Sequence, residues 1–307
     1  MKNNWTTLLL LLTLAACNPD PSPEPDGKGE DPVPPTVVSE NSQIADGTKI
    51  CVFGDSGTAG DEQMLVASYL KEEGCDQVRV VGDIIYEDGL EGPDDQQFMD
   101  KFYDPYKEML EGDVPFYIAL GNHDYNGDTK AWLELANRHT SIIFPAFYYA
   151  EVWDDICFVT FDTNTWWGFF PQKDWIEESW PEISEGCSLS LAFGHHPYLS
   201  VGDHGDADSD DKDFLKEHVI GRFDAYFSGH DHDLSDEGEV DGTRLIVSGA
   251  AGKLRPLAAK PRDFAISALG YVTLTVKREG GAPSIDYEFI VIDSENGRQV
   301  VHQGQIK

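Results

Sequence analysis

Five short segments of this chain share one pattern, in which an apolar run leads to a glycine and then to side chains that can bind a metal ion. In Val81–Tyr86 (VGDIIY), the carboxylate of Asp83 and the phenol of Tyr86 are three residues apart, so both oxygens can face one centre. Open α/β sheets build their sites at the carboxyl ends of strands, so the pattern predicts one site assembled from five strand ends. The other four segments are 51–57 (CVFGDSG), 116–124 (FYIALGNHD), 191–197 (LAFGHHP) and 225–232 (AYFSGHDH).

Helical patterns separate these strands, which predicts an α/β fold with mixed sheets. The first helix is expected to begin at Asp61 and to end at Gly74, and Pro105 should bend or split a second helix over 94–111. Beyond Gly229 we expect antiparallel strands divided by turns. Further helices are predicted near 132–135, 175–176 and 214–220, and further strands at 146–152, 156–161, 243–249, 270–278, 284–293 and 298–306.

The first 16 residues (MKNNWTTLLLLLTLAA) are typical of a signal peptide, because Lys2 precedes an apolar block too short to span a bilayer as a helix. Leu14–Cys17 (LAAC) resembles a bacterial lipobox, so Cys17 is expected to be the lipidated first residue of the mature protein. A plain secretory signal is the alternative. Residues 17–46 are rich in proline and acidic residues and predict an extended tether.

The chain of 307 residues carries 56 Asp and Glu against 22 Lys and Arg, a formal net charge of −34. Nucleic acids and anionic bilayers would be repelled by this charge, so we expect neither as a partner. Membrane attachment is expected only through the lipid on Cys17. The predicted location is a bacterial cell envelope, lipid-anchored at the outer membrane or cell surface, or else periplasmic or secreted; the oligomeric state stays open.

Four further cysteines, an even number in an exported chain, allow three disulfide pairings. Cys51 and Cys75 lie near the starts of two strands that should be neighbours, and Cys157 and Cys187 stand likewise before Asp162 and a later strand end. We therefore favour the pairs Cys51–Cys75 and Cys157–Cys187. Free buried thiols are the alternative, since cysteine is often a small core residue.

The side chains at the strand ends indicate which metals the site would bind. Carboxylate, phenol, amide and imidazole groups together do not suit calcium, which prefers oxygen throughout, or a thiolate zinc site. They suit a pair of iron, zinc or manganese ions, and a carboxylate such as that of Asp83 can bridge two ions about 3.5–4 Å apart. The candidate ligands are Asp55, Asp83, Tyr86, Asn122, His195, His230 and His232.

Together, the segments GDSG, GDIIY, GNHD, GHHP and GHDH resemble the five-block signature of the calcineurin-like metallophosphoesterases, and specifically of the purple (tartrate-resistant) acid phosphatases. The similarity covers roughly residues 50–255, including SGAAG at 248–252. Gly57 stands where other metallophosphoesterases have a histidine, and they lack a tyrosine at the position of Tyr86. The resemblance implies a sandwich of two mixed β-sheets flanked by helices, with a catalytic domain over 47–307.

Transferred to this sequence, the resemblance implies a binuclear centre that contains Fe(III) and a second, divalent metal (iron, zinc or manganese). The ferric ion would be held by Asp55, Tyr86, His232 and the bridging Asp83. The divalent ion would be held by Asp83, Asn122, His195 and His230.

The resemblance also implies catalytic residues outside the metal ligands. His123, oriented by Asp124, would contact the phosphoryl group, and His204 would bind substrate or donate a proton. Two residues depart from the family pattern: Ser56 replaces a usual tryptophan and His196 a usual tyrosine. Either change could alter the pocket, and His196 could compete with its neighbour as a ligand.

The function implied is that of an exported acid phosphatase, which hydrolyses small phosphate monoesters by attack of a metal-activated hydroxide. The sequence contains neither the Gly-x-Ser-x-Gly nucleophile motif nor a Walker phosphate-binding loop, which argues against those enzyme classes. A phosphodiesterase or nucleotidase with the same site is the alternative. A lipoprotein that binds metal or phosphate without catalysis is a further alternative from another class.

Two other segments have competing interpretations. Residues 206–217 imitate a calcium loop, but Asp211 occupies the position of the required glycine, so acidic residues at the start of the helix near Phe214 are the better interpretation. Aromatic residues at Trp166, Trp167, Phe169 and Phe170 either wall the leaving-group pocket or pack locally.

Overall fold

The computed structural model describes residues 37–40, 44–164, 169–278 and 281–307, which lie in one compact unit. The predictions for residues 1–36, including Cys17, and for Trp166 and Trp167 lie outside the described residues. Phe169 and Phe170 are described only as backbone. Among the described residues, no helix has the length and apolar composition needed to cross a bilayer.

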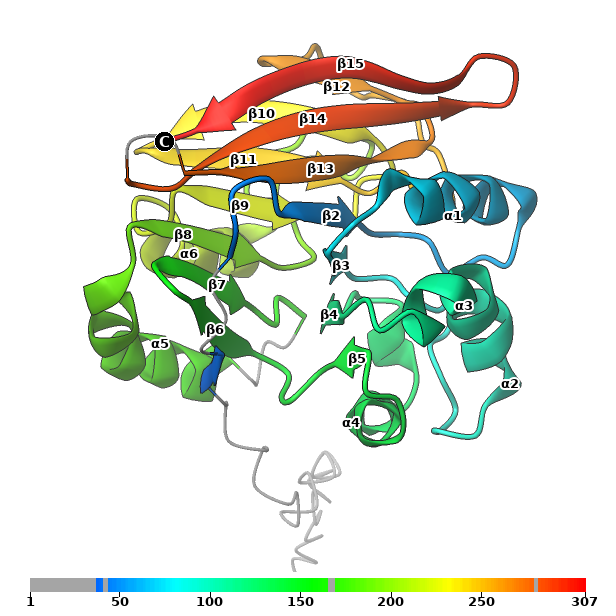
Figure 1. The fold of residues 1–307 in the computed structure, drawn as a ribbon, viewed down its shortest axis with the longest axis horizontal. Coiled ribbons are helices and arrows are strands. Elements are labelled where there is room, and N and C mark those ends of the chain that lie inside the picture. Colours follow the sequence, from blue (N-terminus) through cyan, green and yellow to red (C-terminus); the bar gives the residue numbers. More distant parts are fainter. Residues whose placement is uncertain (1–36, 41–43, 165–168, 279–280) are drawn as a thin grey trace, which may run out of the picture. The chain divides into compact units, whose positions relative to one another are not determined.

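Two mixed β-sheets form the centre of this unit, as the family resemblance predicts (Figure 1). In each sheet, a group of parallel strands carries the segments that lead to the predicted ligands. The seven-stranded sheet has the order β15 (Gly297–Ile306), β14 (Ser284–Asp293), β13 (Gly270–Lys277), β2 (Lys49–Phe53), β3 (Gln77–Val81), β4 (Phe116–Ala119), β5 (Ile142–Ile143). The eight-stranded sheet has the order β1 (Val37–Glu40), β6 (Tyr149–Trp153), β7 (Ile156–Thr160), β8 (Leu189–Phe193), β9 (Ala225–Ser228), β11 (Thr243–Ser248), β10 (Leu234–Val240), β12 (Phe264–Ile266).

The two sheets pack face to face because their strands carry apolar side chains on both faces. In β2, Ile50 and Val52 join the core between the sheets, whereas Cys51 and Phe53 join the core beneath helices. Side chains alternate between the two faces of a strand, so a strand buried on both faces must be apolar throughout. The result is a four-layer arrangement of helices, sheet, sheet and helices.

Helices cover the outer face of each sheet (Figure 1). The sequence prediction of a bent or split helix over 94–111 is confirmed: a π-helical segment, Met99–Tyr103, separates two α-helices just before Pro105. Proline lacks a backbone N–H and interrupts regular helix bonding. The α-helices are α1 (Asp61–Glu73), α2 (Gln96–Phe98), α3 (Asp104–Glu111), α4 (Lys130–Arg138), α5 (Phe169–Ile183) and α6 (Ser209–His218).

The structure differs from the sequence expectation in five strands, two of which, β5 and β12, are short strands that were not predicted. The strand β1 and the buried Ile44 fall in the range that we assigned to the tether, and β1 pairs in parallel with β6. The strand β10 (LSDEGEV) was not predicted, because its polar residues hide the strand pattern. The strand β11 is antiparallel to β10, as expected, but pairs in parallel with β9 on its other side.

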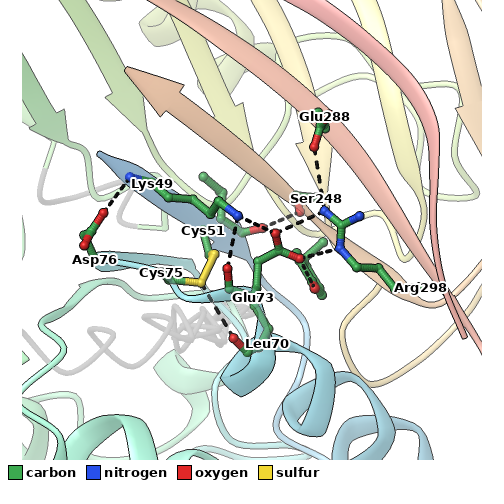
Figure 2. The surroundings of a disulfide bond; sticks show 11 residues. Lys49, Cys51, Leu70, Glu73, Cys75, Asp76, Ser248, Glu288 and Arg298 are labelled. Carbon is green, nitrogen blue, oxygen red and sulfur yellow. Dashed lines mark hydrogen bonds and ion pairs between the residues drawn. A yellow bond between two sulfur atoms is a disulfide. The ribbon is translucent and has the colours of Figure 1, made fainter. Parts of the chain in front are cut away.

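Both favoured disulfides are present. Cys51–Cys75 ties β2 to the residue that follows the C-cap of α1, with the Cα atoms 5.8 Å apart (Figure 2). Cys157–Cys187 ties β7 to the segment before β8, also with a Cα separation of 5.8 Å. Each bridge therefore joins the start of a strand to the chain that leads into its parallel neighbour.

Candidate metal centre

The loops that follow β2, β3, β4, β8 and β9 bring all seven predicted ligands together. Five of the ligands, Asp55, Asp83, Asn122, His195 and His230, follow within three residues of a strand end, and Tyr86 and His232 lie farther along the loops after β3 and β9. The parallel strands place these ends at one edge of the two sheets, which is where α/β proteins assemble sites.

One cluster consists of Asp55, Tyr86 and His232, all buried. The phenolic oxygen of Tyr86 lies 3.1 Å from Asp55 Oδ1 and 3.1 Å from His232 Nε2. The carboxylate and imidazole atoms are 3.5 Å from each other. Three donor atoms at these mutual distances can bind a single ion between them.

A second cluster consists of Asn122, His195 and His230. Asn122 Oδ1 lies 3.0 Å from both His195 Nε2 and His230 Nδ1, and these two nitrogens are 3.3 Å apart. His195 Nδ1 lies 2.8 Å from the carbonyl oxygen of Val81. A carbonyl oxygen only accepts hydrogen bonds, so Nδ1 carries the proton and Nε2 keeps a lone pair for a metal.

Asp83 lies between the two clusters. Its Oδ1 is 3.5 Å from His195 Nε2 of the second cluster, and its charge, like that of Asp55, helps to raise the pKa of the buried Tyr86 in the first cluster. Donor atoms of Asp55, Asp83 and His195 lie within 4.8 Å of one another. The geometry therefore suits a carboxylate that bridges two ions.

The protonation of these groups fits a pair of cations. Burial, together with the charge of Asp83, raises the pKa of Asp55 well above its usual value. Burial lowers the pKa of His230 far below its usual value and that of His232 to about 4, so both imidazoles are neutral and able to bind metal. Buried carboxylates beside neutral histidines need positive charge, and two metal ions would supply it.

The backbone around the ligands is held in an unusual conformation. Asp55, Asp83 and His230 have positive φ angles of 58°, 52° and 70°, which cost roughly 1–3 kcal/mol each in residues other than glycine. A Cβ atom on Gly121 would lie 2.2 Å from Asp83 Oδ1, and one on Gly229 would lie 2.4 Å from Asp55 Oδ2. These glycines are therefore required for the close approach of the ligand loops.

His123 lies beside the centre, with its ring 4.5 Å from the Tyr86 ring and its side chain 29% exposed. Its backbone amide donates a 2.9 Å hydrogen bond to Asp83 Oδ1, and its Nδ1 lies 2.5 Å from the carbonyl oxygen of Glu87. The carbonyl accepts the Nδ1 proton, so Nε2 is the ring atom left to face a ligand.

Asp124 has a different role from the one implied by the resemblance. Its buried carboxylate accepts hydrogen bonds from the backbone amides of Gly121 (2.8 Å), Ile84 (3.1 Å) and Ile85 (3.1 Å). Asp124 therefore fixes the loops that follow β3 and β4. The His123 ring is oriented instead by the Glu87 carbonyl.

His204 is exposed and stacks on the ring of His230, with the ring centroids 4.4 Å apart. Its backbone amide donates a 2.7 Å hydrogen bond to Asp231 Oδ1, and the Ser200 hydroxyl donates to Asp231 Oδ2. The sequence placed His204 at the site but missed the role of Asp231. In the sequence, the only sign of this role is that Asp231 lies between two ligand histidines. That position does not show which loop Asp231 contacts.

His196 faces the same cluster as His195 and His230, with a ring nitrogen within 4.8 Å of theirs. Its Nδ1 lies 3.0 Å from Thr163 Oγ1, which already accepts the backbone amides of His195 (3.2 Å) and His196 (3.0 Å). With both lone pairs engaged, the hydroxyl donates its proton to Nδ1, so the neutral ring carries its own proton on Nε2. This arrangement favours His195 as the ligand and makes His196 a hydrogen-bond donor.

Two further sequence interpretations can be compared with the structure. Ser56 is fully buried, so the residue that replaces the usual tryptophan does not form part of the pocket surface. The acidic segment before Phe214 begins the helix α6, where Asp208 is the N-cap and accepts hydrogen bonds from the amides of Asp210 and Asp211. This confirms the helix-start interpretation over a calcium loop.

Comparison with known proteins shows what the chain is similar to. Residues 48–234 match the calcineurin-like phosphoesterase family. Purple acid phosphatase 3 of Arabidopsis thaliana is 30% identical over 237 residues, which cover 68% of this chain and 64% of that protein. Tartrate-resistant acid phosphatase type 5 of Sus scrofa is 25% identical, with coverage of 62% and 63%. The chain thus spans less than two thirds of the length of these relatives.

Solved structures share the fold. The Plasmodium protein GAP50, described as the anchor in the inner membrane complex, has a TM-score of 0.71 at 20% identity, covering 86% of this chain and 89% of that one. The purple acid phosphatase PPD1 from yellow lupin (Lupinus luteus) seeds has a TM-score of 0.65 at 18% identity, covering 87% of this chain and 55% of that one.

Proposed function

The chain belongs to the calcineurin-like phosphoesterase family as a member that resembles the purple acid phosphatases, and we propose that it hydrolyses phosphate monoesters at a binuclear metal centre. One observation carries the proposal: Asp83 lies between a cluster with a phenol and a cluster with two imidazoles and an amide. A phenol on one side and imidazole and amide donors on the other support a mixed ferric and divalent pair.

The ferric ion is assigned to Asp55, Tyr86, His232 and Asp83, and the divalent ion to Asp83, Asn122, His195 and His230. When bound, the two ions would neutralise phosphate oxygens and lower the pKa of a bound water. Tyr86 supports a trivalent ion, because an unperturbed phenol loses its proton only near pH 10 and burial beside Asp55 and Asp83 raises the pKa of Tyr86 further.

We assign the protonation of the leaving group to His123 or His204. His123 Nδ1 donates to the Glu87 carbonyl, so its Nε2 is the atom that can hold or deliver a proton. His204 is held over His230 by the bond from its amide to Asp231, and its exposed ring can approach a bound ester from the solvent side. His196 Nε2–H can donate a hydrogen bond to a phosphate oxygen.

Turnover of p-nitrophenyl phosphate under mildly acidic conditions, with metal analysis of the same sample, tests this function. We expect hydrolysis by protein with about two metal ions per chain, and strong loss of activity in Asp83→Asn. Faster hydrolysis of bis(p-nitrophenyl) phosphate would point to the phosphodiesterase alternative. Metal-replete protein that binds phosphate but hydrolyses neither ester would indicate the binding lipoprotein.

Export and lipid anchoring are part of the same proposal and rest on residues 1–17 of the sequence. If Cys17 carries the lipid, Cys17→Ser releases the protein from the membrane fraction or blocks its processing. Unchanged membrane association of Cys17→Ser would contradict the anchor. Asn18 is not the aspartate that commonly retains lipoproteins at an inner membrane, so the outer membrane or cell surface is the expected location.

A further inference from the structure

The π-helical turn Met99–Tyr103 joins α2 to α3, and Pro105 explains why it occurs there. Proline has no backbone N–H, so the carbonyl of Lys101, four residues earlier, lacks its α-helical donor. The helix bonding shifts to a spacing of five residues, with the amide of Asp104 donating to the carbonyl of Met99. Such turns are frequent at functional sites, and this one presents both the carbonyl and the ammonium group of Lys101 to other parts of the chain.

The carbonyl of Lys101 is bound by Gln63, a fully buried residue of α1. Gln63 Nε2 donates to this carbonyl at 2.6 Å, and Gln63 Oε1 accepts the backbone amides of Thr58 (3.1 Å) and Ala59 (2.8 Å). One side chain thus ties the π-helical turn to the segment after β2, which also carries the proposed ligand Asp55.

The ammonium group of Lys101 binds the loop after β3. Its Nζ donates hydrogen bonds to the carbonyl oxygen of Tyr86 and, at 2.5 Å, to Gln97 Oε1. The Gln97 side chain in turn donates to the carbonyl of Gly89 at 3.2 Å. Both hydrogen-bond partners of this half-buried ammonium are neutral oxygens, although the chain holds 56 acidic residues. Because a charged donor makes a stronger hydrogen bond than a neutral one, Lys101 fixes the Tyr86 carbonyl firmly.

The segment that Lys101 holds connects a proposed ferric ligand with a proposed catalytic histidine. The amide of Tyr86 donates to the carbonyl of Gly57 at 2.9 Å, so with Lys101 on its carbonyl both backbone groups of Tyr86 are bound. The next carbonyl, that of Glu87, lies 2.5 Å from His123 Nδ1. A shift of this segment would therefore move the Tyr86 phenol within its cluster and turn the His123 ring.

We propose that Lys101 is a positioning residue of the metal centre. It holds the phenol of Tyr86 against Asp55 and His232 and sets the direction of His123 Nε2, and it acts only through these residues. The π-helical turn is the element of the fold that brings Lys101 to the centre. This inference rests on the proposed function, because Tyr86 and His123 have their roles only in that function.

Lys101→Met tests the role, because methionine keeps most of the side-chain length and removes the three N–H donors. We expect the visible charge-transfer band of the ferric phenolate to shift and kcat for p-nitrophenyl phosphate to fall by about 10- to 100-fold, the effect of a small misplacement. The iron content should stay unchanged. Lys101→Arg keeps donors for the Tyr86 carbonyl and should restore the band and most of kcat. If Lys101→Met does not fold, Lys101→Gln takes its place with the same expectation.

Lys107→Met is the matched control, because Lys107 is an exposed cation of α3 with a side chain 51% exposed, and its loss changes the net charge equally. The band and kcat of Lys107→Met should stay within about twofold of the wild type, since exposed charges contribute little. A wild-type band and kcat in Lys101→Met, or an equal loss in Lys107→Met, would overturn the role of Lys101.

A double-mutant cycle with His123→Ala tests the route through the Glu87 carbonyl. If Lys101 acts on catalysis by directing His123, Lys101→Met should lower kcat much less in the His123→Ala background than in the wild type. Full additivity of the two losses would contradict this route.

If the wild-type protein shows no visible band and hydrolyses no ester, the proposed function fails, and hydrogen exchange of the metal-free protein judges Lys101. The backbone amides of residues 86–89 should then exchange about tenfold faster or more in Lys101→Met, because local opening becomes easier. Exchange in α6 should not change. Equal exchange of residues 86–89 in the two proteins would contradict the positioning role.

Discussion

The backbone amide of His204 donates a 2.7 Å hydrogen bond to the carboxylate of Asp231, the residue between the two histidines of the GHDH segment. The other carboxylate oxygen accepts the hydroxyl proton of Ser200, which in turn accepts the amide of Gly202. A single buried carboxylate therefore holds the His204 loop against the loop that supplies one ligand to each metal cluster.

Asp231→Ala should lower kcat by roughly 10- to 100-fold, because a shift of about 1 Å in an acid–base group can have effects of this size. Metal content should be largely retained, since Asp231 is not among the proposed ligands. Steady-state kinetics with elemental analysis of the same preparation measure both. Asp213→Ala removes an exposed carboxylate from α6 and serves as the control. Full activity of Asp231→Ala would show that the loop does not need this anchor.

His123→Ala and His204→Ala should each lower kcat by about 10²–10⁴-fold, the range of general acid–base groups. Both rings lie beside the metal clusters and contact ligand residues through ring packing, so both variants should bind metal normally. Kinetics over the acidic pH range and metal analysis provide the test. If His204→Ala keeps full activity throughout that range, the role assigned to His204 is wrong.

The clustering of the seven candidate ligands could be predicted from the sequence because the information was local. Each ligand follows an apolar run and a glycine, and the topology of parallel strands brings such ends together without further detail. The same reasoning predicted both disulfides from the adjacency of strands. By contrast, the hydrogen bonds of Asp124 with Ile84 and Ile85 and the bond between His204 and Asp231 join residues that are 27 to 40 positions apart, and no local pattern marks them.

The strand β10 shows why some elements of the fold could not be predicted from the sequence. Asp236 is fully buried, yet it accepts hydrogen bonds from Arg244 (2.5 Å), Tyr287 (2.7 Å) and His302 (3.0 Å). These partners come from three other strands. A buried carboxylate is tolerated when such partners satisfy it, but in the sequence the acidic run reads as a loop.

Arg79 in β3 makes a buried ion pair with Glu151 in β6, at 2.6 Å with both side chains 1% exposed, and thereby joins the two sheets. Its guanidinium also lies 3.9 Å from the centroid of the Tyr117 ring. Arg79→Met should destabilise the protein by about 3–5 kcal/mol, because it leaves a carboxylate buried without its counter-charge. Urea unfolding measures the loss.

The double variant Arg79→Met, Glu151→Leu should recover most of that loss, because apolar pairs often replace buried ion pairs without cost. The exposed pair Lys71–Glu108 is the control, and its disruption should change stability by less than about 1 kcal/mol. A double variant no more stable than Arg79→Met would contradict this account of the ion pair.

Glu73 at the end of α1 is surrounded by donors beside the Cys51–Cys75 bridge (Figure 2). Lys49 lies 2.7 Å and Arg298 2.6 Å from its carboxylate, and the Tyr271 hydroxyl donates at 2.9 Å. Burial alone would raise the pKa of Glu73, but the hydrogen bonds from Arg298, Lys49 and Tyr271 outweigh it and lower the pKa below the usual value.

A carboxylate with a lowered pKa in the folded state contributes stability above its unfolded pKa of about 4.3, and that stability is lost as the pH falls through the folded pKa. Glu73→Gln should therefore lower the free energy of unfolding by about 1.5–3 kcal/mol near pH 7. The loss should be much smaller at a pH below the folded pKa of Glu73. Thermal or urea unfolding at several pH values tests the trend, with the exposed Glu108→Gln as control. An equal cost at every pH would rule out the charge as the cause.

The last prediction tests whether Tyr86 binds ferric iron or is an ordinary buried tyrosine. Its oxygen lies 3.1 Å from both Asp55 and His232, and the nearby carboxylates oppose loss of its proton unless a strongly Lewis-acidic ion compensates them. A phenolate on ferric iron absorbs visible light by charge transfer, so the oxidised protein should be purple to pink. Tyr86→Phe should lose the band while Asp55, Asp83 and His232 still hold the metal, more weakly. Absorption spectra with metal analysis of both proteins give the test. An active wild-type protein that is colourless and contains only zinc or manganese would instead make Tyr86 a structural residue whose hydroxyl serves as a hydrogen-bond donor.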